Sequence, residues 1–182
     1  MQEAHPGTVV ELWTTDQHRL GLQPILRRVW CRRGDRPHAV VQHRYQWCYL
    51  SAFVHPPSGR TFWLLLPTVS TITFNVALAE FAHAVGAGRG KQIILVCDGA
   101  GWHGSPQVQV PGGVHLHLLP PYSPELQPAE RLWPLTNEPL ADRHFQDLEA
   151  LQTVQAQRCL TLQAMPEVIR AQTNFHWWPQ TA

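Results

Sequence analysis

The chain has 182 residues, of which 44% are hydrophobic and 15% are charged, and its formal net charge is +1. This length predicts a single domain, and the composition excludes a disordered chain. The near-neutral balance also excludes a strongly basic nucleic-acid binder and an acidic tail protein as descriptions of the whole chain. Because no apolar run reaches membrane-spanning length and no leader-like segment opens the chain, we expect a soluble, cytoplasmic protein.

The first half of the chain predicts three strands and one helix. Residues 8–15 are rich in β-branched and aromatic side chains, which is typical of a strand, and a long irregular stretch rich in Arg, Gly and Pro follows. Residues 45–55 and 60–66 have the same strand composition, and a Pro-Pro-Ser-Gly turn between them predicts an antiparallel hairpin. Apolar residues at helical spacing over 71–85, followed by a glycine, predict a helix.

The second half predicts two further strands and then helices. The short apolar run at 93–97 is typical of a strand buried on both faces, and residues 114–119 form another strand closed by two prolines. Helices are predicted over 128–144, where two prolines must break or bend the helix, over 147–163 and over 166–173. This order predicts an α/β fold with a mixed five-stranded sheet, an antiparallel hairpin beside parallel strands, and flanking helices.

Basic residues are concentrated in the first third of the chain. Residues 1–66 contain eight arginines and only four acids. Five of those arginines fall within ten residues: Arg27, Arg28, Arg32, Arg33 and Arg36. This run could contact a phosphate backbone, or it could be a solvated loop, and the sequence favours neither interpretation.

Three acidic residues stand near the ends of predicted elements. Asp16 follows the first strand, Asp98 follows the fourth, and Glu130 lies near the start of the helix after the last strand. If the first and fourth strands are parallel neighbours, both aspartates emerge at one edge of the sheet. Three carboxylates there would repel one another unless a hard divalent cation neutralised them. An acid after a strand is more often a turn former or a helix cap, so spacing alone leaves both alternatives open.

The surrounding residues resemble the signature blocks of a known family. The two blocks are LVCDGAGWHGS at 95–105 and LPPYSPELQPAERLW at 119–133, and a third segment, at 11–37, is ELWTTDQHRLGLQPILRRVWCRRGDRP. Together they resemble the DDE transposases, in particular the mariner-like branch of bacterial 630-type insertion sequences. The resemblance departs from the usual pattern at three positions: Gln17, where Glu is usual, and Gly99 and Gln127, where Asn is usual.

The resemblance implies a fold, a site and a reaction. The fold is ribonuclease H-like, and Asp16, Asp98 and Glu130 match the metal-binding catalytic triad, which would hold two Mg²⁺ or Mn²⁺ ions. The reaction is hydrolysis of a phosphodiester at a transposon end, followed by transfer of the freed 3′-hydroxyl into target DNA at a TA dinucleotide. The partners are the transposon terminal repeats, target DNA and a second copy of the chain, in a bacterial cytoplasm. Two alternatives are another ribonuclease H-like nuclease and an inactive transposase remnant.

The same resemblance bears on the domain organisation. Such transposases carry a helix-turn-helix region before the catalytic domain, whereas this chain begins almost at the first catalytic strand. We therefore expect residues 1–182 to form the catalytic domain alone, without the helix-turn-helix region. Either the DNA-reading half is encoded separately or the chain is a remnant.

A few other residues have two plausible roles. His103 stands at the family's histidine position, where it could contact a DNA phosphate, support the metal ligands or simply pack. Glu125 is close enough to Glu130 to be the reserve choice for the third ligand. Trp102 and Trp133 could stack on splayed bases, but core packing is the favoured interpretation.

Overall fold

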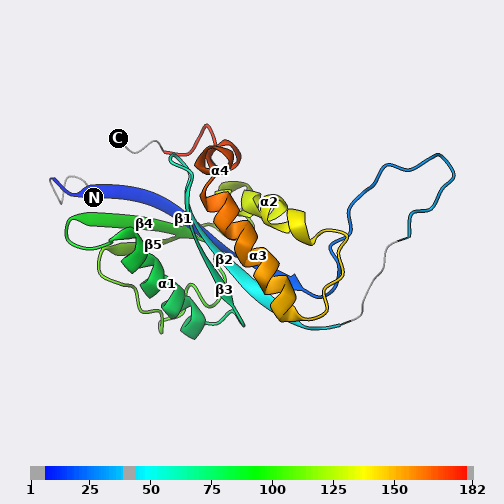
Figure 1. Cartoon of the computed structure of the whole chain (residues 1–182). Coiled ribbons are helices and arrows are strands. Elements are labelled where there is room, and N and C mark those ends of the chain that lie inside the picture. The colour runs from blue at the N-terminus through cyan, green and yellow to red at the C-terminus, as the bar shows by residue number, and fades with distance from the viewer. Residues whose placement is uncertain (1–6, 39–43, 180–182) are drawn as a thin grey trace.

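A mixed five-stranded sheet forms the centre of the computed structural model, which describes residues 7–38 and 44–179 (Figure 1). The strand order is β3-β2-β1-β4-β5. Pairing is antiparallel between β1 and β2 and between β2 and β3, and parallel between β1 and β4 and between β4 and β5. The strands are β1 (Val9–Gly21), β2 (Trp47–His55), β3 (Arg60–Leu66), β4 (Lys91–Cys97) and β5 (Val114–Leu118). The predicted sheet, with its hairpin beside parallel strands, is confirmed.

The hairpin turn requires a glycine. Gly59 has a φ of 69°, in the left-handed region that side chains with a Cβ rarely adopt. A Cβ there would also overlap the backbone of Pro166 at the start of a later helix. The turn therefore touches the C-terminal part of the fold through backbone alone.

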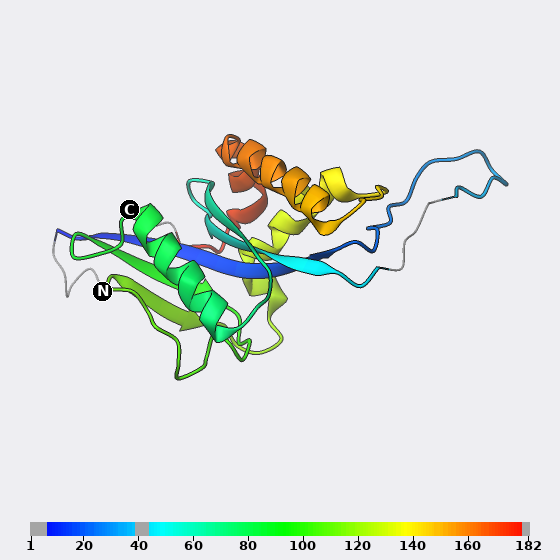
Figure 2. The same cartoon turned by 60° about the horizontal axis from the view of Figure 1, so that its bottom comes forward.

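Helices cover the two faces of the sheet (Figure 2). On one face lies α1 (Thr71–Val85), which begins at a Ser70–Thr73 capping box and ends at Gly86 in the left-handed conformation. Its Phe81 is fully buried and stacks on Phe53 with ring centroids 4.3 Å apart. The other face carries α2 (Trp133–Asn137), α3 (Leu148–Gln163) and α4 (Pro166–Thr173). As predicted, α1, α3 and α4 form over nearly the expected ranges.

The first strand is longer than predicted. It continues through Asp16 to Gly21, so the aspartate lies within the strand and does not follow it. The reason is that β4 accompanies β1 only as far as Thr14, whereas β2 pairs with it from Thr14 to Gly21. A polar sequence can extend as a strand when its backbone groups have a partner on one side.

The predicted helix over 128–144 is broken into short pieces. These are the 3₁₀ turn Pro128–Leu132, then α2, then the 3₁₀ turn Glu138–Leu140. Prolines stand at positions 128, 134 and 139, and each removes a backbone N–H that a continuous helix would need. The chain leaves this region through Asp142, whose φ is 55°.

The predicted irregular stretch after the first strand is an arm that projects from the body of the molecule (Figures 1 and 2). At its base Ile25 forms an isolated bridge with Ala141. The arginine run 27–36 lies on this arm and is exposed. Among the described residues, no helix is both long and apolar enough to cross a membrane.

Candidate active site

Two of the predicted acidic residues lie side by side in the sheet. The parallel register of β1 and β4 ends with Thr14 opposite Val96, and Asp16 and Asp98 each follow two residues later. Asp98 directly follows the end of β4, and Asp16 lies beside that end on β1, which itself continues to Gly21. This confirms that both aspartates lie at the carboxyl end of the parallel pair. Cys97, just before Asp98, is buried, as a strand interior requires.

Asp16 is held by two hydrogen bonds in a largely buried position. The Trp133 indole N–H donates to Oδ2 over 3.0 Å, and the Gln17 backbone N–H donates to Oδ1 over 2.8 Å. Burial raises the pKa of Asp16 to about 6, against the lowering effect of these two bonds, and the charges of Asp98 and Glu130 add to the rise. A nearby cation would therefore stabilise the ionised form of Asp16.

Asp98 is held by a buried histidine. His103 Nδ1 lies 2.6 Å from Oδ1 of Asp98, and the Ala100 backbone N–H donates to the same oxygen over 3.1 Å. The bond from His103 lowers the pKa of Asp98 and outweighs the effect of partial burial. The Asp98 side chain is 49% exposed, whereas that of His103 is fully buried. Asp98 can therefore still reach a ligand, while the histidine acts on it from within the protein.

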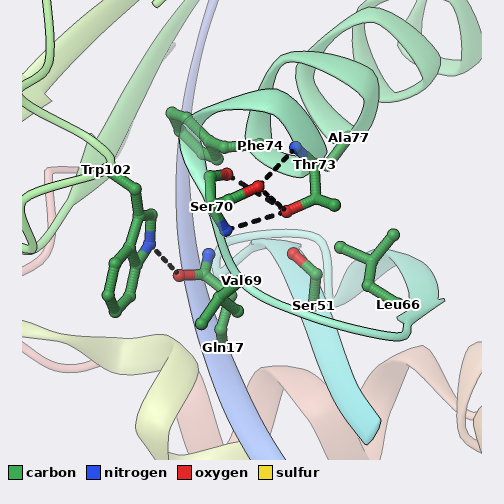
Figure 3. A pocket seen from close by; sticks show the side chains of 9 residues that line it. All are labelled: Gln17, Ser51, Leu66, Val69, Ser70, Thr73, Phe74, Ala77 and Trp102. Carbon is green, nitrogen blue, oxygen red and sulfur yellow. Dashed lines mark hydrogen bonds between the residues drawn. The ribbon is translucent and has the colours of Figure 1, made fainter.

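An indole fixes which nitrogen of His103 carries the proton. The Trp102 Nε1–H lies 3.1 Å from Nε2 of His103 and 3.1 Å from Oε1 of Gln17 (the Gln17 contact is drawn in Figure 3). Because an indole N–H can only donate, Nε2 must accept, and the proton of a neutral ring is on Nδ1, facing Asp98. Gln17 thus links β1 to the loop that carries the second aspartate.

The third acid, Glu130, lies on the 3₁₀ turn Pro128–Leu132. Its side chain is exposed and, with Asp98, lines one open pocket. Burial and the charge of Asp98 raise the pKa of Glu130. The turn is anchored by the buried Gln127, which donates to the Thr15 carbonyl over 3.0 Å and accepts from the Thr14 hydroxyl. The glutamine thus fastens the segment carrying Glu130 to the strand carrying Asp16.

The chemistry of these three residues suits a hard divalent cation. Carboxylate oxygens are the preferred ligands of Mg²⁺ and Mn²⁺, and the pKa of Asp16 is raised by the charges of both other acids. As the side chains lie, no three His, Cys, Asp or Glu residues within 7–38 and 44–179 form a ready-made metal site. Of the three acids, Glu130 is the exposed one.

Other predicted residues have different surroundings. Glu125 lies on the separate 3₁₀ turn Pro124–Leu126 and does not line the pocket of Glu130. His103 is too buried to touch a DNA phosphate, so of its possible roles the structure places it in support of Asp98. In the arginine run, Nη1 of Arg27 is 3.4 Å from Oε1 of Glu138. The run lies on the projecting arm, apart from the sheet that carries the two aspartates (Figure 1).

Sequence reasoning missed the role of two tryptophans. Trp133 and Trp102 were expected mainly as core packing, yet their indole nitrogens donate to Asp16 and to His103. The available signal was position, since Trp102 directly precedes the histidine and Trp133 follows Glu130 by three residues. Gln17 and Gln127, which depart from the family pattern, also make hydrogen bonds in the site.

Comparison with solved structures identifies the fold. The chain resembles the Mos1 strand transfer complex at a TM-score of 0.57 and 16% identity, over 92% of this chain and 56% of that one. A pre-cleavage Mos1 transpososome gives a TM-score of 0.60 and 14% identity, over 92% and 57%. This chain thus spans little more than half the length of the Mos1 chains. The shared architecture is the ribonuclease H-like fold.

Sequence comparison identifies the family. An uncharacterized protein of Sinorhizobium fredii, y4pE/y4sA, is 36% identical over 108 residues, which are 59% of this chain and 78% of that protein. The family profile described as DDE superfamily endonuclease matches residues 11–152, which include all three acids. The chain belongs to the DDE superfamily endonucleases.

Proposed function

We propose that this chain is the catalytic domain of a DDE transposase, with Asp16, Asp98 and Glu130 as its metal-binding and catalytic residues. The observation that carries the proposal is the pairing of Asp16 with Asp98 at one sheet edge, with Glu130 on the same pocket as Asp98. The three acids would hold two Mg²⁺ or Mn²⁺ ions. Such a pair of ions supplies an activated water or hydroxyl and neutralises charge on the leaving oxygen.

The remaining residues of the site orient its ligands. Trp133 and His103 each donate to one oxygen of an aspartate and leave other lone pairs for a ligand. Gln127 holds the Glu130 segment against β1. Phosphodiester displacement needs little covalent work from the protein, because positioning and charge neutralisation dominate. Residues that hydrogen-bond to metal-binding carboxylates fix the orientation of those carboxylates and so contribute to metal affinity.

The substrate we propose is DNA, specifically the terminal repeats of an insertion element of the mariner-like bacterial branch and a TA target. Structures of Mos1 include a paired-end complex with the left transposon end and paired-end complexes with Mn and with Mg. The likeness of the folds supports the same class of metal and substrate here. We propose as well that two copies of the chain together hold two transposon ends. The arginine run on the arm is the proposed contact for the phosphate backbone.

A strand-transfer assay tests this proposal. Purified protein is incubated with a duplex ending in a free 3′-hydroxyl, supercoiled plasmid and Mg²⁺ or Mn²⁺. Covalent joining of the duplex to plasmid is expected, with loss of joining in Asp98→Asn and retention in Glu80→Gln, a control on the exposed face of α1. Nicking without joining would favour another ribonuclease H-like nuclease. Neither reaction from a folded protein would mean that a separate DNA-reading half is required or that the chain is an inactive remnant, and adding that half in trans would separate the two cases.

A further inference from the structure

A second groove lies along β1, beyond the acidic site. Arg19 and Gly21 on β1 line it together with Arg44, Tyr45 and Trp47 at the start of β2. We call this the β1–β2 groove. Gly21 pairs with Trp47, and a Cβ on that glycine would lie 3.1 Å from the Gln46 carbonyl oxygen. Because Gly21 has no side chain, no side-chain atoms from this position fill the groove.

The groove lies on the face of β1 that carries Gln17. Side chains alternate along a strand, so Gln17, Arg19 and Gly21 share one face, whereas Asp16 and His18 point to the other face and contact Trp133. Gln17 contacts Trp102, whose neighbour His103 bonds Asp98. At about 3.4 Å per residue, Arg19 stands about 7 Å from Gln17 along the strand.

The groove combines free positive charge with exposed aromatic surface. The Arg19 guanidinium lies 5.7 Å from the centroid of the Trp47 ring. Trp47 is 45% exposed and Tyr45 is 72% exposed. Arg44 donates to the Gln46 side chain and to the Gln146 carbonyl, which are neutral acceptors.

Neither arginine of the groove has a carboxylate within ion-pair distance in the described part of the chain. Positive charge that tracks a backbone, combined with aromatic rings that stack on bases, is how proteins bind single-stranded nucleic acid. The charge of the groove thus complements a phosphate backbone, and its rings complement bare bases.

We propose that the β1–β2 groove binds unpaired DNA, with Arg19 and Arg44 on phosphates and Trp47 and Tyr45 against bases. The proposal rests on the proposed function, since it takes the substrate to be DNA. It commits to an unpaired strand because a duplex hides the faces of its bases from the rings.

The test measures DNA binding by the full chain in EDTA, so that it does not depend on catalysis. Fluorescence anisotropy with an oligo-dT probe and with a fully paired duplex is recorded over a range of salt concentrations. The variants are Trp47→Ala, Trp47→Phe and Arg19→Gln. Trp177→Ala and Arg170→Gln change an exposed tryptophan and an exposed arginine in the C-terminal segment and serve as matched controls. Circular dichroism checks that each variant is folded.

Loss of one stacking ring is expected to weaken oligo-dT binding at least about five-fold in Trp47→Ala, with recovery in Trp47→Phe. Binding of the paired duplex should change less than about two-fold. Arg19→Gln should flatten the dependence of log K on log salt by about 0.7, the value for one phosphate contact on a single strand. Oligo-dT binding equal to wild type in Trp47→Ala, or equal weakening of both probes, would overturn the proposal. Cleavage by wild type, measured separately with metal, reports on the proposed function alone.

Discussion

Replacing Asp16 by Asn should change how the stability of the metal-free protein depends on pH. Burial and the neighbouring acids raise the pKa of Asp16 from 3.8 to about 6. The folded protein therefore holds this proton more tightly than the unfolded chain does, and the wild type gains stability as pH falls through about 6. Above that pH the buried charge destabilises the fold by at most about 3 kcal/mol, at 1.36 kcal/mol per pKa unit.

The magnitude of the effect can be separated from the hydrogen bonds that the variant loses. Asn cannot accept from both Trp133 and Gln17, which costs about 1–3 kcal/mol, but that loss does not depend on pH. Between about pH 7.5 and about pH 5, linkage gives the wild type a gain of about 1.4 kcal/mol relative to Asp16→Asn. The difference in free energy of unfolding between the two proteins is therefore measured at both pH values. The change in that difference with pH reports the effect of the carboxyl group alone.

The assay is urea unfolding of wild type and Asp16→Asn in EDTA at both pH values, followed by tryptophan fluorescence. A second series at about pH 7.5 adds Mg²⁺. A concentration ten times the dissociation constant should stabilise the wild type by about 1.4 kcal/mol and the variant by less. Equal pH dependence in the two proteins would refute the reasoning about burial. Equal stabilisation by Mg²⁺ would refute the role of Asp16 as a ligand.

Three further predictions concern stability and are checked by the same unfolding measurement. Burial lowers the pKa of His55 to about 4, so the unfolded chain takes up this proton at a higher pH than the folded protein does. From about pH 7.5 to about pH 5, the free energy of unfolding of the wild type should fall by about 2 kcal/mol relative to that of His55→Gln. The same pH dependence of stability in both proteins would contradict this. Gly59→Ala should destabilise the fold by more than the about 1–2 kcal/mol of left-handed backbone alone, because its Cβ meets Pro166; a smaller loss would show that the turn can relax. Gln127→Met should cost about 1–3 kcal/mol by leaving buried polar groups on β1 unpaired, and an unchanged midpoint would show that this contact is not needed.

Much of the fold could be predicted from local patterns. The apolar run at 93–97 and the hairpin composition at 45–66 predict strands, and the helical spacing over 71–85 with the glycine after it predicts a helix. The end of β1 could not be predicted in this way, because Gln17, His18 and Arg19 are polar and become a strand only through pairing with β2. The segment after Pro128 was also uncertain, since its prolines leave several ways to break a helix.

Part of the candidate site could also be predicted from the sequence, and part could not. The meeting of Asp16 and Asp98 follows from parallel neighbouring strands, which the order of elements indicates. The bond from Trp133 to Asp16 joins residues 117 positions apart in the chain and depends on how the broken helix lies over the sheet. The burial of His103 depends equally on packing, because Phe74 of α1 covers its ring at 4.4 Å between centroids. Position in the sequence places Trp133 close to Glu130 and Trp102 beside His103, but it does not show which side-chain atoms meet.

The central claim is that Asp16, Asp98 and Glu130 together hold the metal that cuts DNA. Glu130 tests it most directly, because Glu125 offers a matched control on the neighbouring turn outside the pocket. The measurement is Mg²⁺-dependent nicking of supercoiled plasmid by wild type, Glu130→Gln and Glu125→Gln at equal concentrations. We predict that Glu125→Gln nicks at the wild-type rate and that Glu130→Gln is at least about a hundred-fold slower. Nicking by Glu130→Gln at the wild-type rate, or its loss in Glu125→Gln instead, would contradict this assignment.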